Sequence, residues 1–372
     1  MEKNRSSERF ASPSPHDNQG ERPSLLSGPM GMSAGDSLAV VAALPRRKPI
    51  YAAFAEGLRR FWKLATINRK VALGSAIIAF FILVAIFGPM FPLQDPNAIS
   101  HLSNRGPSAA HWLGTSTSGQ DLFSQLVYGT RSSIFWSFFT GLLVTAVSAF
   151  VGLIAGYAGG VLSEVLSMLI NVFLVVPALP LAVVLAAYFP RGPLTIAVVI
   201  TVTSWAYGAR LLRSQTLSMR SREFVTAARA SGESTWRIIF YEILPNEASI
   251  VATIFITTTI AVVLFWASLQ FLGLADVSDV NWGSMLYWAQ QADGLFQGFW
   301  WWFVPPGLCI AILAAGLSLI NFGIDEISDP RLGSAVAAKR VRRVKRGTLS
   351  GGQVSGAAAP GGARGVPDTF LF

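Results

Sequence analysis

The chain has 372 residues, of which 52% are hydrophobic and only 13% are charged. This composition excludes an ordinary soluble domain and predicts a polytopic membrane protein. The formal net charge of +9 does not indicate a nucleic-acid partner, because much of the basic charge lies beside apolar segments or near the chain ends. The single cysteine, Cys309, excludes a disulfide framework within the chain, and the three scattered histidines predict no metal site.

The two ends of the chain differ in composition from its middle. Residues 1–45 are rich in Ser, Pro, Gly and charge, and we expect a disordered cytoplasmic tail. Residues 46–70 mix basic and apolar side chains and predict a helix on the cytoplasmic membrane surface. Residues 333–372 are first basic and then rich in Gly and Ala, which predicts a flexible tail.

Six apolar segments predict an all-α domain of six transmembrane helices over residues 71–332. Each has about 20 residues or more, which is enough to cross a hydrocarbon core of about 30 Å. Pro177 and Pro180 lie in the third segment and predict a kink, with two re-entrant halves as the alternative. The expected spans are 71–92, 133–156, 165–189, 193–212, 247–272 and 301–323.

Lysines and arginines gather in the N-terminal flank, in the loop 213–246 and in the C-terminal flank. With six spans these regions share one side, and the positive-inside rule places that side, with both termini, in the cytoplasm. The loops 93–132 and 273–300 then face outward, and the second has no Lys or Arg.

The loop 213–246 is polar and basic, and it is too short to form a domain. It predicts a helix at about 221–231, a turn at Gly232 and a second helical run closed by Pro245. Such a knob at the membrane surface could be bound by a soluble partner.

The composition of this knob favours a contact surface. We expect Ser221 to cap the first helix and Glu223 to favour its dipole. The small residues of the knob would let another backbone approach, and a solvated amphipathic loop whose alanines only favour helix is the alternative. The small residues are Ala227, Ala228 and Gly232, and the expected inward anchors are Phe224 and Trp236.

The outer segment before the last span is aromatic. Most of its aromatic residues are expected to be interfacial anchors, and a stacking platform for sugar rings or aromatic side chains is the alternative. They are Trp282, Tyr287, Trp288, Phe296, Phe299, Trp300, Trp301 and Trp302.

Signals of an energy-converting or catalytic site are missing. The interiors of the six segments lack Asp, Glu, Lys, Arg and His, which ion-coupled transport usually requires. The dipeptide Gly-Lys of a phosphate-binding loop does not occur, and neither does a His-Glu-x-x-His helix. We therefore predict no catalytic, cofactor-binding or metal-binding residue, and a pore subunit that is not an enzyme and takes its energy from a partner.

The sequence T-A-A-R-A-S-G at 226–232, followed by Leu244-Pro245, resembles the EAA loop of bacterial ABC importer permeases. Thr226 stands where that family usually has Glu. Further matches resemble the dipeptide and oligopeptide branch, in its second permease subunit, and extend the likeness over roughly 65–335. They lie at 113–121, 126–133, 155–160, 269–274, 282–286, 306–307 and 329–332.

The resemblance implies a type I ABC importer permease fold in the bacterial cytoplasmic membrane. It implies as partners a second homologous permease, two ATPase subunits that bind ATP and Mg, an extracellular solute-binding protein and membrane lipid. The ATPase-docking residues that it implies are Glu223, Ala227, Ala228, Arg229, Gly232 and Pro245, and the candidates for the outer substrate path are Asp121, Arg131, Trp282 and Trp288.

The solute is the least determined property. The branch as a whole favours di- or oligopeptides. The sequence N-F-G-I-D-E at 321–326, together with the Trp-rich outer loop, is more similar to branch members assigned to oligosaccharides such as cellobiose-like glycans, which are the second expectation. A passive channel or membrane scaffold that needs no ATPase is the alternative from another class.

Overall fold

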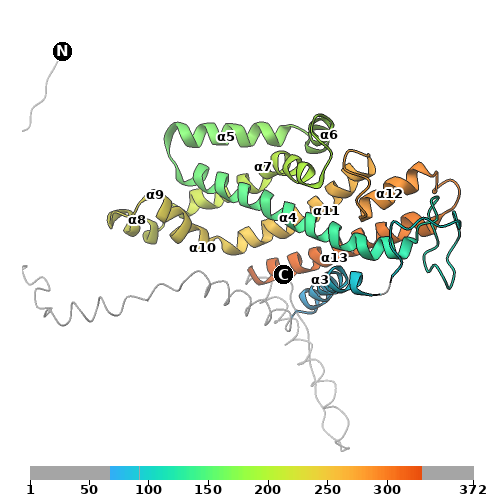
Figure 1. Ribbon diagram of the computed structural model, residues 1–372. Helices are drawn as coiled ribbons and strands as arrows, with labels where there is room; N and C mark the ends of the chain where they lie inside the picture. Colours follow the sequence, from blue (N-terminus) through green and yellow to red (C-terminus); the bar gives the residue numbers. More distant parts are fainter. Residues whose placement is uncertain (1–67, 92, 329–372) are drawn as a thin grey trace, which may run out of the picture. The chain divides into compact units, whose positions relative to one another are not determined.

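The computed structural model describes residues 68–91 and 93–328, so the predictions for 1–45, 46–67 and 329–372 lie outside the described residues. In the described ranges the chain is helical and has no strand, apart from one isolated antiparallel bridge between Thr115 and Asp121. The elements in Figure 1 are α3 (Arg69–Phe87), η1 (Gly88–Met90), α4 (Leu122–Tyr157), α5 (Gly160–Val175), α6 (Ala178–Tyr188), α7 (Pro193–Met219), α8 (Glu223–Ala230), α9 (Thr235–Arg237), the π-helix η2 (Ile238–Ile243), α10 (Leu244–Asn246), α11 (Ala248–Phe271), α12 (Trp282–Gln291) and α13 (Trp300–Ser328).

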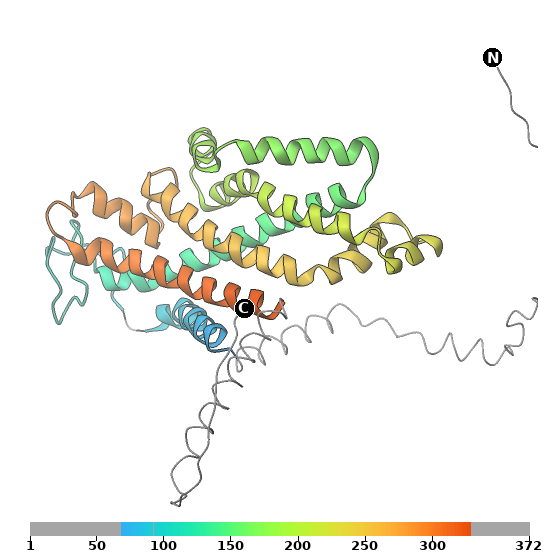
Figure 2. The same ribbon diagram turned by 180° about the vertical axis from the view of Figure 1, so that it is seen from behind.

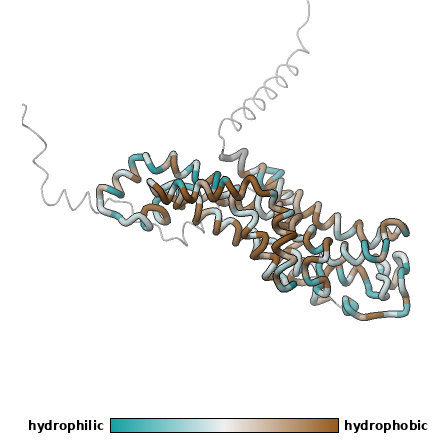
Figure 3. The backbone as a smooth tube through the Cα atoms, turned by 90° about the horizontal axis from the view of Figure 1, so that it is seen from above, coloured by the Kyte–Doolittle hydropathy of each residue, from teal (hydrophilic) through white to brown (hydrophobic). Residues whose placement is uncertain are grey.

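Several of these helices can cross a membrane. Within the described residues, five are long and apolar enough, and a sixth follows if α5 and α6 form one bent span. Figure 3 shows hydrophobic backbone along the middle of the helices and more hydrophilic backbone toward their ends. The all-α membrane class expected from the composition is confirmed.

The third expected span is more strongly bent than a kinked helix. α5 and α6 meet at 91°. The break falls at Val176 and Pro177, and Pro177 precedes the first residue of α6. Proline has no backbone N–H and disfavours helix at the residue before it, so α5 ends there. A bent span and two re-entrant halves both fit this geometry.

Two helices are longer than their apolar segments. α4 begins at Leu122 rather than at 133, because Asp121 caps it by accepting a hydrogen bond from the Ser124 backbone N–H. α7 continues to Met219 rather than ending at 212, and Thr216 in its last turns is fully buried. Polar turns that pack against protein extend a helix beyond the stretch that hydropathy marks, so α4 includes residues 122–132, which the sequence analysis had assigned to a loop.

Small residues bring α4 and α7 close together. Ser148, Gly152 and Gly156 are spaced four apart on one face of α4. The Ser148 hydroxyl donates to the Trp205 carbonyl at 2.7 Å. A Cβ on Gly152 would lie 2.6 Å from the Ala209 carbonyl oxygen of α7. Such stripes of small residues allow membrane helices to pack through their backbones. Figure 2 shows the two helices crossing.

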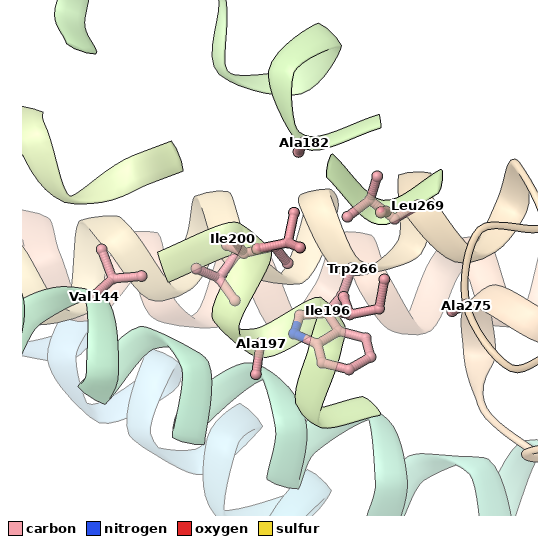
Figure 4. Close-up of a cluster of buried hydrophobic side chains, with 11 residues drawn as sticks. Val144, Ala182, Ile196, Ala197, Ile200, Trp266, Leu269 and Ala275 are labelled. Carbon is pink, nitrogen blue, oxygen red and sulfur yellow. The ribbon is translucent and has the colours of Figure 1, made fainter. Parts of the chain in front are cut away.

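A buried cluster joins α4, α6, α7 and α11 in the middle of the bundle. Figure 4 shows Trp266 of α11 beside Ile196 and Ala197 of α7, and Leu269 of α11 belongs to the same cluster. The Trp266 indole N–H donates to the Thr140 hydroxyl of α4 at 3.0 Å, which satisfies the one polar atom of this ring. This core fixes α11 relative to α4 and α7.

Candidate functional site

The segment that follows α7 lies at the end of the helices opposite to the first outer loop and α12 (Figures 1 and 2). It contains α8, a turn at Gly232, then α9, η2 and α10. This is the helix, glycine turn and second helical run that the sequence predicted. We call residues 220–247 the polar segment.

The turn after α8 is a Schellman motif. The Gly232 backbone N–H donates to the Arg229 carbonyl at 3.0 Å, and the Glu233 N–H donates to the Ala228 carbonyl at 3.1 Å. Gly232 has a φ of +75°, which residues with a Cβ rarely adopt. Gly232 is exposed, and a Cβ there would meet no atom within 4 Å. The turn therefore requires glycine for its backbone angle and not for space.

An apolar cluster anchors the polar segment to α4. Its buried members are Leu153 of α4, Val225 of α8, and Ile238, Ile239 and Ile243 of η2. Each fully buried side chain of this kind contributes about 1.5–3 kcal/mol. The segment is thus fixed to the bundle and can transmit a displacement to it.

A polar contact reinforces the same junction. The Arg229 Nε donates to the Tyr157 hydroxyl at 3.0 Å, and its guanidinium carbon lies 4.9 Å from the centre of the Tyr157 ring. Tyr157 is the last residue of α4. On the second helical run, Arg237 forms an ion pair with Glu233 at 3.5 Å. The candidate docking residue Arg229 therefore has an internal role as well.

Three details of the predicted knob are wrong. Arg222, not Ser221, precedes α8, and the Ser221 hydroxyl donates to Ser218 instead. Trp236 is 56% exposed and stacks on Phe240 rather than pointing inward. The second run does not close at Pro245, because α10 continues to Asn246 and the break before α11 falls at Glu247. The other expected anchor, Phe224, is half-buried against the cluster as expected.

The surface of the polar segment carries small side chains. Ala227, Ala230 and Gly232 are exposed, and Ala228 is half-buried against the apolar cluster. Glu223 is exposed in the first turn of α8, and Pro245 is exposed in α10. A partner would therefore meet backbone and methyl groups over α8, with charged side chains at the rim.

A buried carboxyl that we did not single out from the sequence lies beneath this segment. Glu247 has no exposed surface, and the fully buried Thr216 hydroxyl of α7 donates to its two carboxylate oxygens at 3.1 and 3.3 Å. Burial raises the pKa of Glu247 to about 7, against the lowering effect of the Thr216 hydrogen bond. The only signal in the sequence is a charged residue at the first position of an apolar run.

The candidates for the outer substrate path lie in different environments. Asp121 is 6% exposed, and its carboxylate oxygens contact His111 Nδ1 at 3.0 Å and the Ser124 hydroxyl at 2.6 Å. Trp282 is buried with its ring centre 5.5 Å from that of Phe81. Arg131 is exposed on α4.

Asp121 lines one pocket and Trp282 lines another, while Trp288 lines a third pocket, which none of the other candidates reaches. The pocket has a volume of about 290 Å³ and lies between the residues before α4 and the residues before α12. Trp288 is 48% exposed, and its indole N–H donates to the Val277 carbonyl at 3.1 Å. Polar groups at the same pocket include Ser116, Gln120 and Asp279. Of the four candidates, the structure brings Trp288 alone to this pocket.

The fold and the polar segment define an α-helical multi-pass membrane protein with an anchored, partly exposed polar segment at one end. The chain belongs to the family of binding-protein-dependent transport system inner membrane components, whose model matches residues 148–334. The match includes the polar segment and the helices that hold it.

Relatives extend the likeness over most of the chain. The chain is 35% identical over 284 residues to the dipeptide transport system permease protein DppC of Alkalihalophilus pseudofirmus, covering 74% of this chain and 90% of the relative. It is 32% identical over 279 residues to the oligopeptide transport system permease protein OppC of Bacillus subtilis, covering 73% and 90%. It is 30% identical over 302 residues to the glutathione transport system permease protein GsiD of Pectobacterium atrosepticum, covering 80% and 98%. The resemblance to dipeptide and oligopeptide permeases is confirmed.

Proposed function

We propose that this chain is the permease subunit of an ATP-driven importer of di- or oligopeptides. Its helices form the translocation path together with a second homologous permease. The polar segment faces the cytoplasm with both termini and docks on ATPase subunits that bind ATP and Mg. An extracellular solute-binding protein delivers the substrate to the opposite end.

The observation that carries the proposal is the combination of exposure and anchoring at α8. Its small residues Ala227 and Ala230 are exposed, while Val225 on the other face is fully buried in the apolar cluster. A partner that pushes on α8 therefore pushes on α4 through Leu153 and Tyr157. Peptide substrates are supported by the permeases to which the chain is similar.

Co-purification tests the docking step. Ala227→Arg places a long charged side chain on the exposed face of α8, and we expect ATPase subunits to be lost from the purified complex while the variant still elutes as a folded permease. Gln291→Arg adds the same charge at an exposed position of α12, at the other end, and should retain the ATPase. Full retention of ATPase by Ala227→Arg would refute this docking surface.

Uptake into vesicles tests which solute the protein carries and whether its transport is driven by ATP. The reconstituted complex should import peptides only with ATP and the binding protein. Exposed aromatic residues such as Trp288 and Trp300 support the alternative of oligosaccharides, which would be established by glycan uptake that peptides do not compete. Solute flux through the chain without ATPase subunits would establish a passive channel instead.

A further inference from the structure

A groove of about 670 Å³ lies between α5 and α7. One face of α5 forms most of its wall, with Glu164, Met168, Asn171 and Val175 at helical spacing. Arg213 forms the wall on α7. Arg213 lies in the last turns of α7, just before the polar segment, and Glu164 lies near the start of α5. The groove thus sits toward the end of the bundle that carries the polar segment.

The groove contains two opposite charges that do not neutralise each other. Within the described part of the chain, no ion pair joins Glu164 or Arg213 to any residue. The Arg213 Nε is enclosed and has no hydrogen-bond partner among the described residues. The described residues therefore leave the Arg213 charge without a carboxylate partner, and an anionic group in the groove that Arg213 lines would supply one. Glu164 is exposed on α5, so water solvates its carboxylate, and a cation bound in the groove would be attracted to it.

These charges match the two ends of a peptide. A carboxylate accepts hydrogen bonds from a guanidinium, and an ammonium donates to a carboxylate. The remaining wall is mainly apolar and includes Met168, Val172 and Val175, which can contact side chains without selecting one. A neutral glycan would leave both charges unpaired, and an anionic lipid headgroup would pair with Arg213 but be repelled by Glu164.

We propose that this groove binds a short peptide by its charged termini, the carboxylate at Arg213 and the ammonium at Glu164, on the inner part of the translocation path. The inference rests on the proposed function, because a peptide must reach the groove through the transporter. It assigns to the permease a preference for free termini that is additional to any selection by the binding protein.

The test measures how wild type and variants take up a peptide with free termini and the same peptide with one terminus blocked. The complete transporter is reconstituted in vesicles of phosphatidylcholine and phosphatidylglycerol, and the peptide that the wild type imports fastest from a di- to pentapeptide mixture is chosen as probe. Uptake of this peptide is measured beside its C-terminal amide and its N-acetyl form. The binding protein is the same in all arms, so its own preference cancels.

Arg213→Ala should slow uptake of the free peptide about tenfold, the effect of one charge-assisted hydrogen bond, and should not slow the amide further. Glu164→Gln should slow the free peptide and not the N-acetyl form. Arg213→Lys, which keeps the charge, should give a smaller loss. Arg210→Ala removes an exposed arginine of the same helix that does not line the groove, and should leave both rates unchanged.

Equal slowing of the free and amidated peptides by Arg213→Ala, or no slowing of either, would overturn the assignment. A loss that disappears in vesicles of phosphatidylcholine alone would identify a lipid headgroup as the occupant and would also overturn it. If the wild-type transporter imports peptides but the variants do not show these differences between free and blocked peptides, the groove is not the binding site and the proposed function still stands. If the wild-type transporter imports no peptide, both the groove assignment and the proposed function are wrong.

Discussion

The Thr216 hydroxyl lies 3.1 Å from one carboxylate oxygen of Glu247 and joins the last turns of α7 to the break before α11. Both side chains are fully buried. The bond spans the two points at which the polar segment leaves and re-enters the bundle. Its strength depends on the protonation of Glu247, whose pKa is raised to about 7 by burial.

Stability should therefore fall as the pH rises through this range. The ordinary pKa of the carboxyl is 4.5 and its folded value is about 7, so between these pH values the folded state holds more protons than the unfolded state. Ionisation of the buried Glu247 lowers the free energy of unfolding. This loss is absent below pH 4.5, grows up to pH 7 and is then constant at about 3 kcal/mol. Glu247→Gln should unfold at a higher temperature than the wild type at pH 8, with the difference shrinking toward pH 5.

The measurement is the thermal unfolding midpoint in detergent from pH 5 to pH 8. Glu223→Gln removes an exposed carboxylate of the same polar segment and should keep the wild-type slope. A Glu247→Gln variant whose midpoint follows that of the wild type at every pH would contradict the assignment.

The contact between α4 and α7 gives a second prediction. A Cβ on Gly152 would lie 2.6 Å from the Ala209 carbonyl oxygen and 2.9 Å from the Leu212 Cβ, so the backbones must separate. We expect Gly152→Leu to lower the free energy of unfolding by at least about 1–3 kcal/mol through overpacking. Gly307→Ala is the matched control, because a Cβ there meets no atom within 4 Å and alanine favours helix. The unfolding midpoint should drop for the first variant and stay level or rise for the second.

The turn at Gly232 gives a third prediction, which tests whether glycine is needed there for its backbone angle or for lack of space. Since φ is +75° and the position is open, Gly232→Asn should be tolerated, while Gly232→Val should cost about 1–2 kcal/mol locally. Proteolysis at the polar segment should accelerate for the valine variant alone. If both variants were cleaved equally fast, the glycine would be needed for space or for a partner, and not for its angle.

The sequence allowed the helices and the polar segment to be predicted, but not the contacts that position them. Hydropathy located the spans because apolar length is a local property. It missed the first turns of α4, where Ser124 and Thr130 are buried against protein rather than facing lipid. The groove of Glu164 and Arg213 and the pair of Thr216 and Glu247 join residues far apart in the chain, and no pattern in a single sequence indicates such pairs.

The last prediction concerns Asp121, which has either a structural role or a role in the substrate path. Its carboxylate caps α4 through the Ser124 N–H at 2.8 Å and contacts the buried His111 at 3.0 Å. Asp121→Ala removes the cap and leaves the imidazole without this partner, so we expect a loss of about 2–3 kcal/mol of stability.

Asp95→Ala removes an exposed carboxylate of the same outer region, and its loss should be small. Thermal unfolding and uptake measured on the same preparations distinguish the two roles of Asp121. Because the cap fixes where α4 begins, uptake should fall with stability and recover at lower temperature, where Asp121→Ala is folded. A variant that unfolds like the wild type but imports no substrate would instead place Asp121 in the substrate path, which the sequence predicted and the buried position of its carboxylate disfavours.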